Sequence, residues 1–327
     1  MSAPYRSEDY IRLSAALHAR ETRLLTAALL ERLLDAPTPE EAWKLLSGCG
    51  YPPLERCTME EMERALASQR AALYREIGAM APDKRVVELF QLRYDYHNAK
   101  LALKARRLGT DLSYLAIDCG RYRAQEVLRG DYSAMSAVMR RAMALAEKDA
   151  SGGDLRAAEL TLDRACFEEL SALACETGSA FLQDYAALWI DGVNLRTLVR
   201  VSRMHGDGEL LRASLLRGGH IGVQALLSAR GGALAELTRT GALRRAGELA
   251  VPLLDGGGSL TAFERACDDA LMLYLQRARR TPFGIEVVVG YLGAKEAEFT
   301  AVRTVMSGKL AGLDAEDIRA RLRMSYL

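Results

Sequence analysis

Three pairs of an acidic and a basic residue recur along the chain. Asp95 precedes Lys100, Asp191 precedes Arg196 and Glu298 precedes Arg303, each by five residues. A carboxylate and a cation are groups that general acid–base catalysis and ligand binding both use. Five residues on an α-helix span a rotation of about 140°, whereas side chains that pair on one helix lie three or four residues apart. We therefore expect the acid and the base of each pair to contact different neighbours.

Two interpretations of these pairs follow. The pairs could form catalytic or ligand sites, or they could join helices in a repeated fold. We favour the second, because an enzyme rarely needs three copies of one site, whereas a repeat fold needs each of its joints. A buried pair of this kind would supply register more than net stability. The candidate packing residues are Asp95, Asn98, Lys100, Asp191, Asn194, Arg196, Glu298 and Arg303.

The first pair lies on a stretch, residues 89–108, that has the pattern of an amphipathic helix. Its apolar face has helical spacing and consists of Leu92, Tyr96, Ala99 and Leu103. A basic stripe on another face consists of Lys100, Lys104 and Arg107. Gly109 is a plausible residue to end the helix, since glycine favours the left-handed conformation found there.

The same pattern returns after 96 residues and again, more weakly, after a further 107. The second copy has Leu188, Gly192, Leu195 and Val199 on the apolar face and Arg196, Arg200 and Arg203 in the stripe. The third copy has Lys295, Phe299, Val302 and Met306, with Ala301 in place of the asparagine and Ser307 interrupting the stripe. Asp163-Arg-Ala-Cys166 precedes the second copy, and Glu264-Arg-Ala-Cys267 precedes the third. These correspondences indicate an internal triplication. Lys104, Arg107, Arg200 and Arg203 are a candidate surface for a partner.

Composition argues against several classes of function. The 327 residues carry 44 basic and 43 acidic side chains, so the chain lacks the basic excess of a general nucleic-acid or membrane-surface binder. The same balance disfavours phosphate contacts by the basic stripes. The six cysteines contain no CxxC spacing and indicate buried thiols in a reducing cytoplasm. The N-terminus has no signal-peptide pattern, and the apolar run 285–294 is too short to cross a bilayer.

Motif searches identify no active site and no cofactor. Ser307-Gly-Lys309 lacks the upstream glycine and the Ser/Thr of a phosphate-binding loop. The four histidines are scattered without metal-ligand spacing. We expect neither a metal nor another cofactor.

Helical patterns cover the chain, and no alternating strand pattern is convincing. We expect a long helix over residues 8–34, helices near 58–80, 131–148, 155–176, 179–204 and 260–279, and three short helices within 209–250. The predicted class is all-α, with repeats over 1–112, 113–212 and 213–327 whose boundaries are approximate and whose termini could share one domain.

Three motifs in this order resemble the C subunit of the archaeal and bacterial A/V-type ATPases, whose eukaryotic counterpart is the d subunit of the V-ATPase. They are Leu92-Arg-Tyr-Asp-Tyr-His-Asn-Ala-Lys100, Asp191-Gly-Val-Asn-Leu-Arg196, and Tyr291-Leu-Gly-Ala-Lys-Glu-Ala-Glu298 continuing through Arg303 to Gly308-Lys-Leu-Ala-Gly312. The resemblance covers nearly the whole chain, including Tyr10, Arg12 and Arg20. Gly192 and Gly293 depart from the family pattern. These departures affect the expected packing around the two residues and not the resemblance itself.

The resemblance implies an all-helical, pseudo-threefold funnel with a central cavity and no catalytic residue. Its partners would be the D and F subunits of the central stalk and the membrane rotor ring of proteolipid subunits. Such a protein would join stalk to ring, transmit torque for ATP-coupled proton or sodium transport, and lie peripherally on the cytoplasmic side of the membrane. The alternatives are a helical-repeat scaffold for other partners and an all-helical enzyme.

Overall fold

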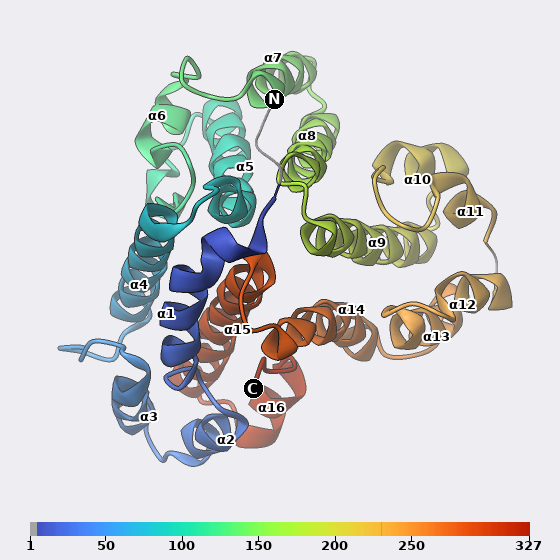
Figure 1. Cartoon of the computed structure of the whole chain (residues 1–327). Coiled ribbons are helices and arrows are strands. Elements are labelled where there is room, and N and C mark those ends of the chain that lie inside the picture. Colours follow the sequence, from blue (N-terminus) through green and yellow to red (C-terminus); the bar gives the residue numbers. More distant parts are fainter. Residues whose placement is uncertain (1–4, 230) are drawn as a thin grey trace. The chain divides into compact units, whose positions relative to one another are not determined.

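The computed structural model of the chain describes residues 5–229 and 231–327 (Figure 1). Within these residues it contains 16 α-helices and four short 3-10 helices, and no strand. The predicted all-α class is confirmed.

The α-helices in chain order are α1 (Ile11–Glu21), α2 (Ala27–Asp35), α3 (Pro39–Leu45), α4 (Met59–Met80), α5 (Arg85–Leu108), α6 (Ala124–Arg129), α7 (Ala137–Ser151), α8 (Leu155–Glu176), α9 (Ala180–Arg203), α10 (Gly208–Ser214), α11 (Val223–Ser228), α12 (Gly232–Thr238), α13 (Arg244–Leu254), α14 (Leu260–Leu275), α15 (Ile285–Leu310) and α16 (Ala315–Arg321). The 3-10 helices are η1 (Ser7–Tyr10), η2 (Leu46–Cys49), η3 (Ser113–Leu115) and η4 (Gln276–Arg280).

Two compact units make up the fold, and the chain passes between them several times, including once within α4 and once within α9. The first unit contains Tyr5, Arg70–Ile190 and Leu216–His220, and the second contains Arg6–Gln69, Asp191–Leu215 and Ile221–Leu327. In the first unit α5 packs against α6, α7 and α8, and in the second unit α15 packs against α1, α3, α14 and α16. The finer division into three repeats stays a prediction.

The three copies found in the sequence form the long helices α5, α9 and α15, and all three end in the same way. The residue after the last turn is left-handed in each: Gly109 (φ 62°), His205 (φ 52°) and Gly312 (φ 72°). The next N–H donates back to the carbonyl five residues earlier, from Thr110 to Ala105, Gly206 to Val201 and Leu313 to Gly308, at 3.2, 2.9 and 2.9 Å. This is the bond that defines a Schellman ending. The shifts of 96 and 107 residues therefore hold to the last turn of each helix.

One long predicted helix is broken in the structure. The prediction over 8–34 was wrong, because α1 ends at Glu21 and α2 begins at Ala27. Thr26 is extended and its side chain accepts a hydrogen bond from the N–H of Leu29, which makes it the N-cap of α2. The N–H of Leu25 donates to a side chain, Glu298, at 2.9 Å. An N–H engaged in this way cannot continue the helical ladder.

Smaller differences lie in the short helices. The region 209–250 belongs to four helices, α10 to α13, where three were expected. The helix near 131–148 is α7, and α6 before it was not predicted. The helix expected to reach Arg279 changes from α14 to the 3-10 helix η4 at Gln276. Short helices have weak periodic patterns, so capping residues and tertiary contacts decide where they begin.

Candidate functional site

The acidic residue of each copy is buried and accepts a hydrogen bond from a backbone N–H outside its own helix. Asp95 accepts from Tyr122 at 3.2 Å, Asp191 from Ile221 at 3.0 Å and Glu298 from Leu25 at 2.9 Å. Their exposed fractions are 0%, 2% and 4%. A buried carboxylate needs such donors, because removal from water is costly without them.

The three N–H donors occupy equivalent positions in the chain. Tyr122, Ile221 and Leu25 each lie two residues before the start of a short helix, namely α6, α11 and α2. The short helix that completes the third copy is therefore α2, near the start of the chain. Glu298 on α15 reaches the N-terminal segment, whereas Asp95 and Asp191 reach residues that follow their own helix in the chain.

The basic residue of each copy contacts a different helix from the acid. Lys100 lies 2.5 Å from Asp163 of α8 (Nζ to Oδ1), and Arg303 lies 2.5 Å from Glu63 of α4 (Nε to Oε1). Arg196 donates to Asp268 of α14 and, at 3.3 Å, to the carbonyl of Glu264. Each acceptor helix is the α-helix that precedes a copy of the long helix: α8 precedes α9, α14 precedes α15 and α4 precedes α5. The acid and the base of one helix thus bind two different neighbours.

The remaining predicted residues divide into buried and exposed groups. The amide of Asn98 donates to the carbonyl of Ile117 at 2.8 Å and accepts from its N–H at 3.0 Å. Asn194 is fully buried as well. In the basic stripes, Lys104 binds Glu159 at 2.6 Å. Arg107, Arg200 and Arg203 are exposed.

Sequence reasoning missed Arg121, which links two buried carboxylates in the first unit. Its Nε lies 2.7 Å from Asp95 and its Nη2 lies 3.0 Å from Glu169, which also accepts from the hydroxyl of Tyr96 at 2.9 Å. Burial raises the pKa of Asp95 to about 6, against the opposing effects of Arg121 and the N–H of Tyr122. Burial lowers the pKa of Arg121, but both carboxylates raise it and the net shift is upward. The guanidinium of Arg121 thus lies between the carboxyl groups of Asp95 and Glu169.

In the third copy, the buried acid accepts a hydrogen bond from a lysine on its own helix. Lys295 donates to Glu298 at 2.5 Å and lies over the rings of Tyr51 and Phe299, 5.4 and 5.1 Å from their centroids. The hydroxyl of Tyr51 also donates to Glu298, at 2.9 Å. The signal for this pair was present in the sequence, since Lys295 stands where the other copies have leucine.

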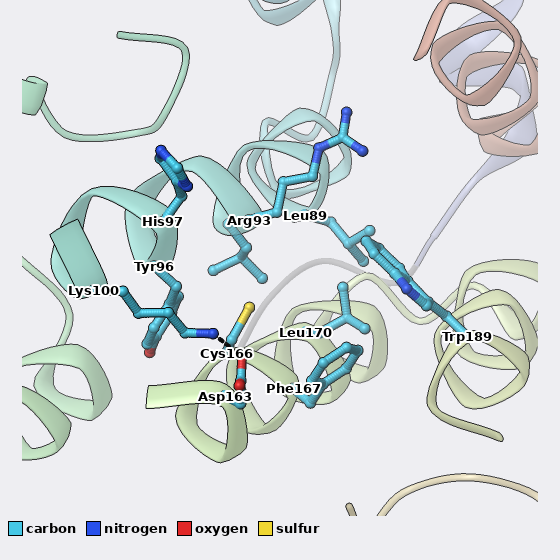
Figure 2. A pocket seen from close by; sticks show the side chains of 11 residues that line it. Leu89, Arg93, Tyr96, His97, Lys100, Asp163, Cys166, Phe167, Leu170 and Trp189 are labelled. Atoms are coloured by element: carbon cyan, nitrogen blue, oxygen red, sulfur yellow. Dashed lines mark hydrogen bonds and ion pairs between the residues drawn. The ribbon is translucent and has the colours of Figure 1, made fainter. Parts of the chain in front are cut away.

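A cavity of about 210 Å³ lies in the first unit, between α5 and α8, with Trp189 of α9 at one end (Figure 2). Its apolar lining comes from Leu89, Leu92, Phe167, Leu170 and Trp189. Arg93, His97, Lys100 and Asp163 supply the polar part of the lining, and Figure 2 shows Lys100 reaching from α5 to Asp163 on α8. None of the predicted acids lines this cavity.

Two further features bear on the chemistry of the chain. Among the residues that the structure describes, no group of three or more His, Cys, Asp or Glu side chains is arranged to hold a metal ion. None of the helices in the described ranges has both the length and the apolar character that a bilayer crossing requires.

Comparison with known families identifies the family of the chain. Residues 13–321 match the family described as ATP synthase (C/AC39) subunit. The chain belongs to the ATP synthase (C/AC39) subunit family. This confirms the resemblance drawn from the three motifs, and it makes the chain a homologue of the C subunit of the A/V-type ATPases.

Members of the C/AC39 family match the chain over nearly its whole length. The C subunit of the V-type sodium ATPase of Enterococcus hirae is 23% identical over 325 residues, which cover 97% of this chain and 99% of that protein. The C subunit of the A-type ATP synthase of Methanocaldococcus jannaschii is 25% identical over 349 residues, with 96% and 86% covered. The C subunit of the V-type ATP synthase of Thermus thermophilus is 26% identical over 318 residues, with 91% and 92% covered.

Proposed function

We propose that this member of the C/AC39 family is a non-catalytic adaptor in the central rotor of an A/V-type ATPase. It joins the D and F subunits of the central stalk to the membrane rotor ring and transmits torque between ATP turnover and proton or sodium transport. It binds no cofactor, and it lies peripherally on the cytoplasmic side of the membrane as part of the complex.

The observation that carries the proposal is the order of the acid and base contacts. The third long helix contacts Leu25, just before α2, and Glu63 of α4, both near the start of the chain, whereas the first two long helices contact segments that follow them. A contact pattern that closes in this way supports a pseudo-threefold ring of three repeats, with both termini in one of them. A closed ring of helices is suited to a part of a rotor, because each repeat is then held by contacts with both of its neighbours.

The acid and base residues serve packing in this proposal. Each acid is held by N–H or cationic donors within the fold, and each base is held by a carboxylate of another helix. Side chains engaged in this way are poorly placed to take up a substrate. The exposed Arg107, Arg200 and Arg203 remain candidates for contacts with partners.

Gentle solubilisation of membranes containing a tagged chain tests the proposal. We expect the stalk proteins and the ring to co-purify with the chain, and membranes depleted of the chain to hydrolyse ATP without moving ions. A structure of that complex should relate α5, α9 and α15 by a threefold rotation. Co-purification with unrelated proteins alone would instead favour the scaffold interpretation.

A further inference from the structure

The α5–α6 loop, the segment that joins these two helices, is bound to α5 by side chains of that helix. Gln91 donates to the carbonyl of Gly120 at 3.1 Å. Asn98 makes two hydrogen bonds to the backbone of Ile117. Asp95 lies on the same face of α5, four residues after Gln91 and three before Asn98. The loop is therefore fixed to one face of the helix, with a carboxyl group at its centre.

The loop covers Asp95 and removes it from water. An added Cβ on Gly120 would lie 2.1 Å from Oδ1 of Asp95, so the loop backbone lies directly against this oxygen. The same oxygen accepts from the N–H of Tyr122 at 3.2 Å, and Oδ2 lies 2.7 Å from Nε of Arg121. Asp95 is 0% exposed as a result. A movement of the loop away from α5 would return this carboxyl group to water.

Two buried carboxyl groups share one cation beneath the loop. Arg121 contacts Asp95 and also Glu169 of α8, whose residue is only 5% exposed. In the described part of the chain, Arg121 is the one cation that forms an ion pair with either of them. If both carboxyl groups were ionised, the cluster would have a net negative charge. Burial of such a charge is unfavourable, and the site avoids it by binding a proton.

The groups around the cluster do not supply the missing positive charge. Lys100 and Asp163 neutralise each other at 2.5 Å. Burial raises the pKa of the Cys166 thiol to about 12 and also raises the pKa of Tyr96, so both groups are neutral near pH 7. The buried residues of α6 and α7, which also pack against α5, are all apolar. The closed loop therefore favours one bound proton in the cluster.

We propose that Asp95, Arg121 and Glu169 form a pH-sensitive latch, which holds the α5–α6 loop more firmly against α5 after the cluster has bound a proton. Burial raises the pKa of Asp95 from the ordinary 3.8 to about 6 in the closed loop. The closed loop thus binds the proton more tightly than an open loop, in which Asp95 meets water. By linkage, the stabilisation of the closed loop is complete below the pKa of the open form and is lost as the pH rises through about 6.

The latch is connected to the start of α7. The ring of Tyr122 lies 5.0 Å from the guanidinium of Arg121, and its hydroxyl accepts from the N–H of Ser136 at 2.9 Å. Ser136 is the N-cap of α7, where its side chain accepts from the N–H of Met139. Ionisation of Asp95 should therefore loosen both the α5–α6 loop and the first turn of α7.

Hydrogen exchange of the loop amides in the free chain measures the opening. The N–H groups of Ile117 and Tyr122 donate to α5 only when the loop is closed. Their opening equilibrium should rise about tenfold from about pH 5 to about pH 7, beyond the intrinsic dependence of exchange on pH. Asp95→Asn, which cannot titrate, should remove this rise. Asp118→Asn should keep it and is the matched control, since Asp118 is exposed in the same loop and accepts from the N–H of Ala124 at 3.0 Å.

A titration locates the proton without altering the site. In a chain labelled with ¹³C at aspartate carboxyl groups, the resonance of Asp95 should titrate with a midpoint near pH 6. Glu169→Gln should move the midpoint to lower pH, because Arg121 then pairs with Asp95 alone. Glu168→Gln should leave it in place and is the control on the same helix, since 57% of the Glu168 side chain is exposed.

Three results would overturn the latch. They are an opening equilibrium that does not change with pH, a midpoint below about pH 5 for Asp95 in the unaltered chain, and a midpoint that Glu169→Gln leaves unchanged. The first two are measured on the unaltered chain, so they decide the question even if a variant fails to fold. Because the latch lies within the first unit, the free chain is sufficient for both measurements.

Discussion

Arg303 and Glu63, which lie far apart in the sequence, form an ion pair with 2.5 Å between Nε and Oε1. The pair corresponds to Lys100 with Asp163 and to Arg196 with Asp268, in which a long helix binds the α-helix that precedes the next long helix. The last long helix, α15, therefore contacts α4 in the way that α5 contacts α8 and α9 contacts α14. The order of these pairs is cyclic although the chain is linear.

Asp95, the buried acid of the first copy, should contribute far more to the free energy of unfolding than Arg303, the exposed base of the third. Replacing Asp95 by Ala leaves Arg121 buried with Glu169 alone and should cost about 3 kcal/mol. Replacing Arg303 by Ala should cost less than about 1 kcal/mol, because 64% of its side chain is exposed. Urea unfolding of both variants measures the two values. Equal losses would contradict the assignment of Asp95 as a buried, paired carboxylate.

Asp268 should be more important than either of its partners. It accepts from Arg196 of α9 through one carboxylate oxygen and from Arg323 of the C-terminal tail, at 2.8 Å, through the other. Asp268→Asn weakens both contacts, so its loss of stability should exceed that of Arg196→Gln or Arg323→Gln, each about 0.5–1 kcal/mol. Thermal unfolding of the three variants gives the order. If Arg196→Gln proved the most destabilising, the shared acceptor would not be the important member of the group.

Two helical glycines that depart from the family pattern should respond in opposite ways to alanine. A Cβ on Gly293 would lie 2.3 Å from Cδ1 of the buried Leu275, whereas the nearest atom to a Cβ on Gly192 is Nη1 of Arg196 at 4.0 Å. Gly293→Ala should destabilise by about 1–3 kcal/mol through overpacking. Gly192→Ala should be neutral or stabilise by about 0.5–1 kcal/mol, since alanine is the better helix former. Chemical denaturation of both single variants measures the difference, and a tolerated Gly293→Ala would mean that α14 does not approach α15 this closely.

The sequence was sufficient to predict the long helices and their correspondence. Periodic apolar positions identified α5, α9 and α15, and the registers of 96 and 107 residues extend to Gly109, His205 and Gly312 at their ends. Long periodic segments are predictable because many residues carry the same signal.

The tertiary partners were not predictable from the sequence. Arg121 lies in a loop, so no periodic pattern distinguished it from other arginines. The break between α1 and α2 depends on Glu298, which accepts from Leu25 across almost the whole length of the chain. Both the Asp163 motif and Lys100 were identified in the sequence, but their pairing was not, because a single sequence does not reveal which distant side chains meet.

His205 is the one non-glycine residue with positive φ in the described part of the chain, and replacing it should increase stability. It stands at φ 52°, where the other copies have Gly109 and Gly312. A non-glycine side chain in this conformation destabilises the folded state by about 1–2 kcal/mol. Glycine removes this strain, but it also increases the conformational entropy of the unfolded chain, which offsets part of the gain. His205→Gly should therefore stabilise by about 0.5–1 kcal/mol, and Gly109→Ala should destabilise by about 1 kcal/mol. Thermal melting of both variants provides the measurement, and a loss of stability in His205→Gly would mean that its side chain makes a contact worth more than the strain.

His18 should make stability depend on pH near neutrality. Its Nδ1 lies 3.0 Å from Oε2 of Glu21, and its Nε2 lies 3.2 Å from the carbonyl oxygen of Pro282. Both partners can only accept, so the ring makes both hydrogen bonds only when it is doubly protonated. The hydrogen bond to Glu21 raises the pKa of His18 above its usual 6.5, and burial opposes that rise.

A histidine whose pKa is raised in the folded state contributes stability that is complete below the unfolded pKa and is lost as the pH rises through the folded pKa. The melting temperature of the unaltered chain should therefore fall more steeply from about pH 6 to about pH 8 than that of His18→Gln. Glu21→Gln should flatten the dependence as well, because it removes the main cause of the raised pKa. Melting curves across this range measure both slopes. A slope that both substitutions leave unchanged would show that His18 is neutral in the folded chain, with one of its two bonds unmade.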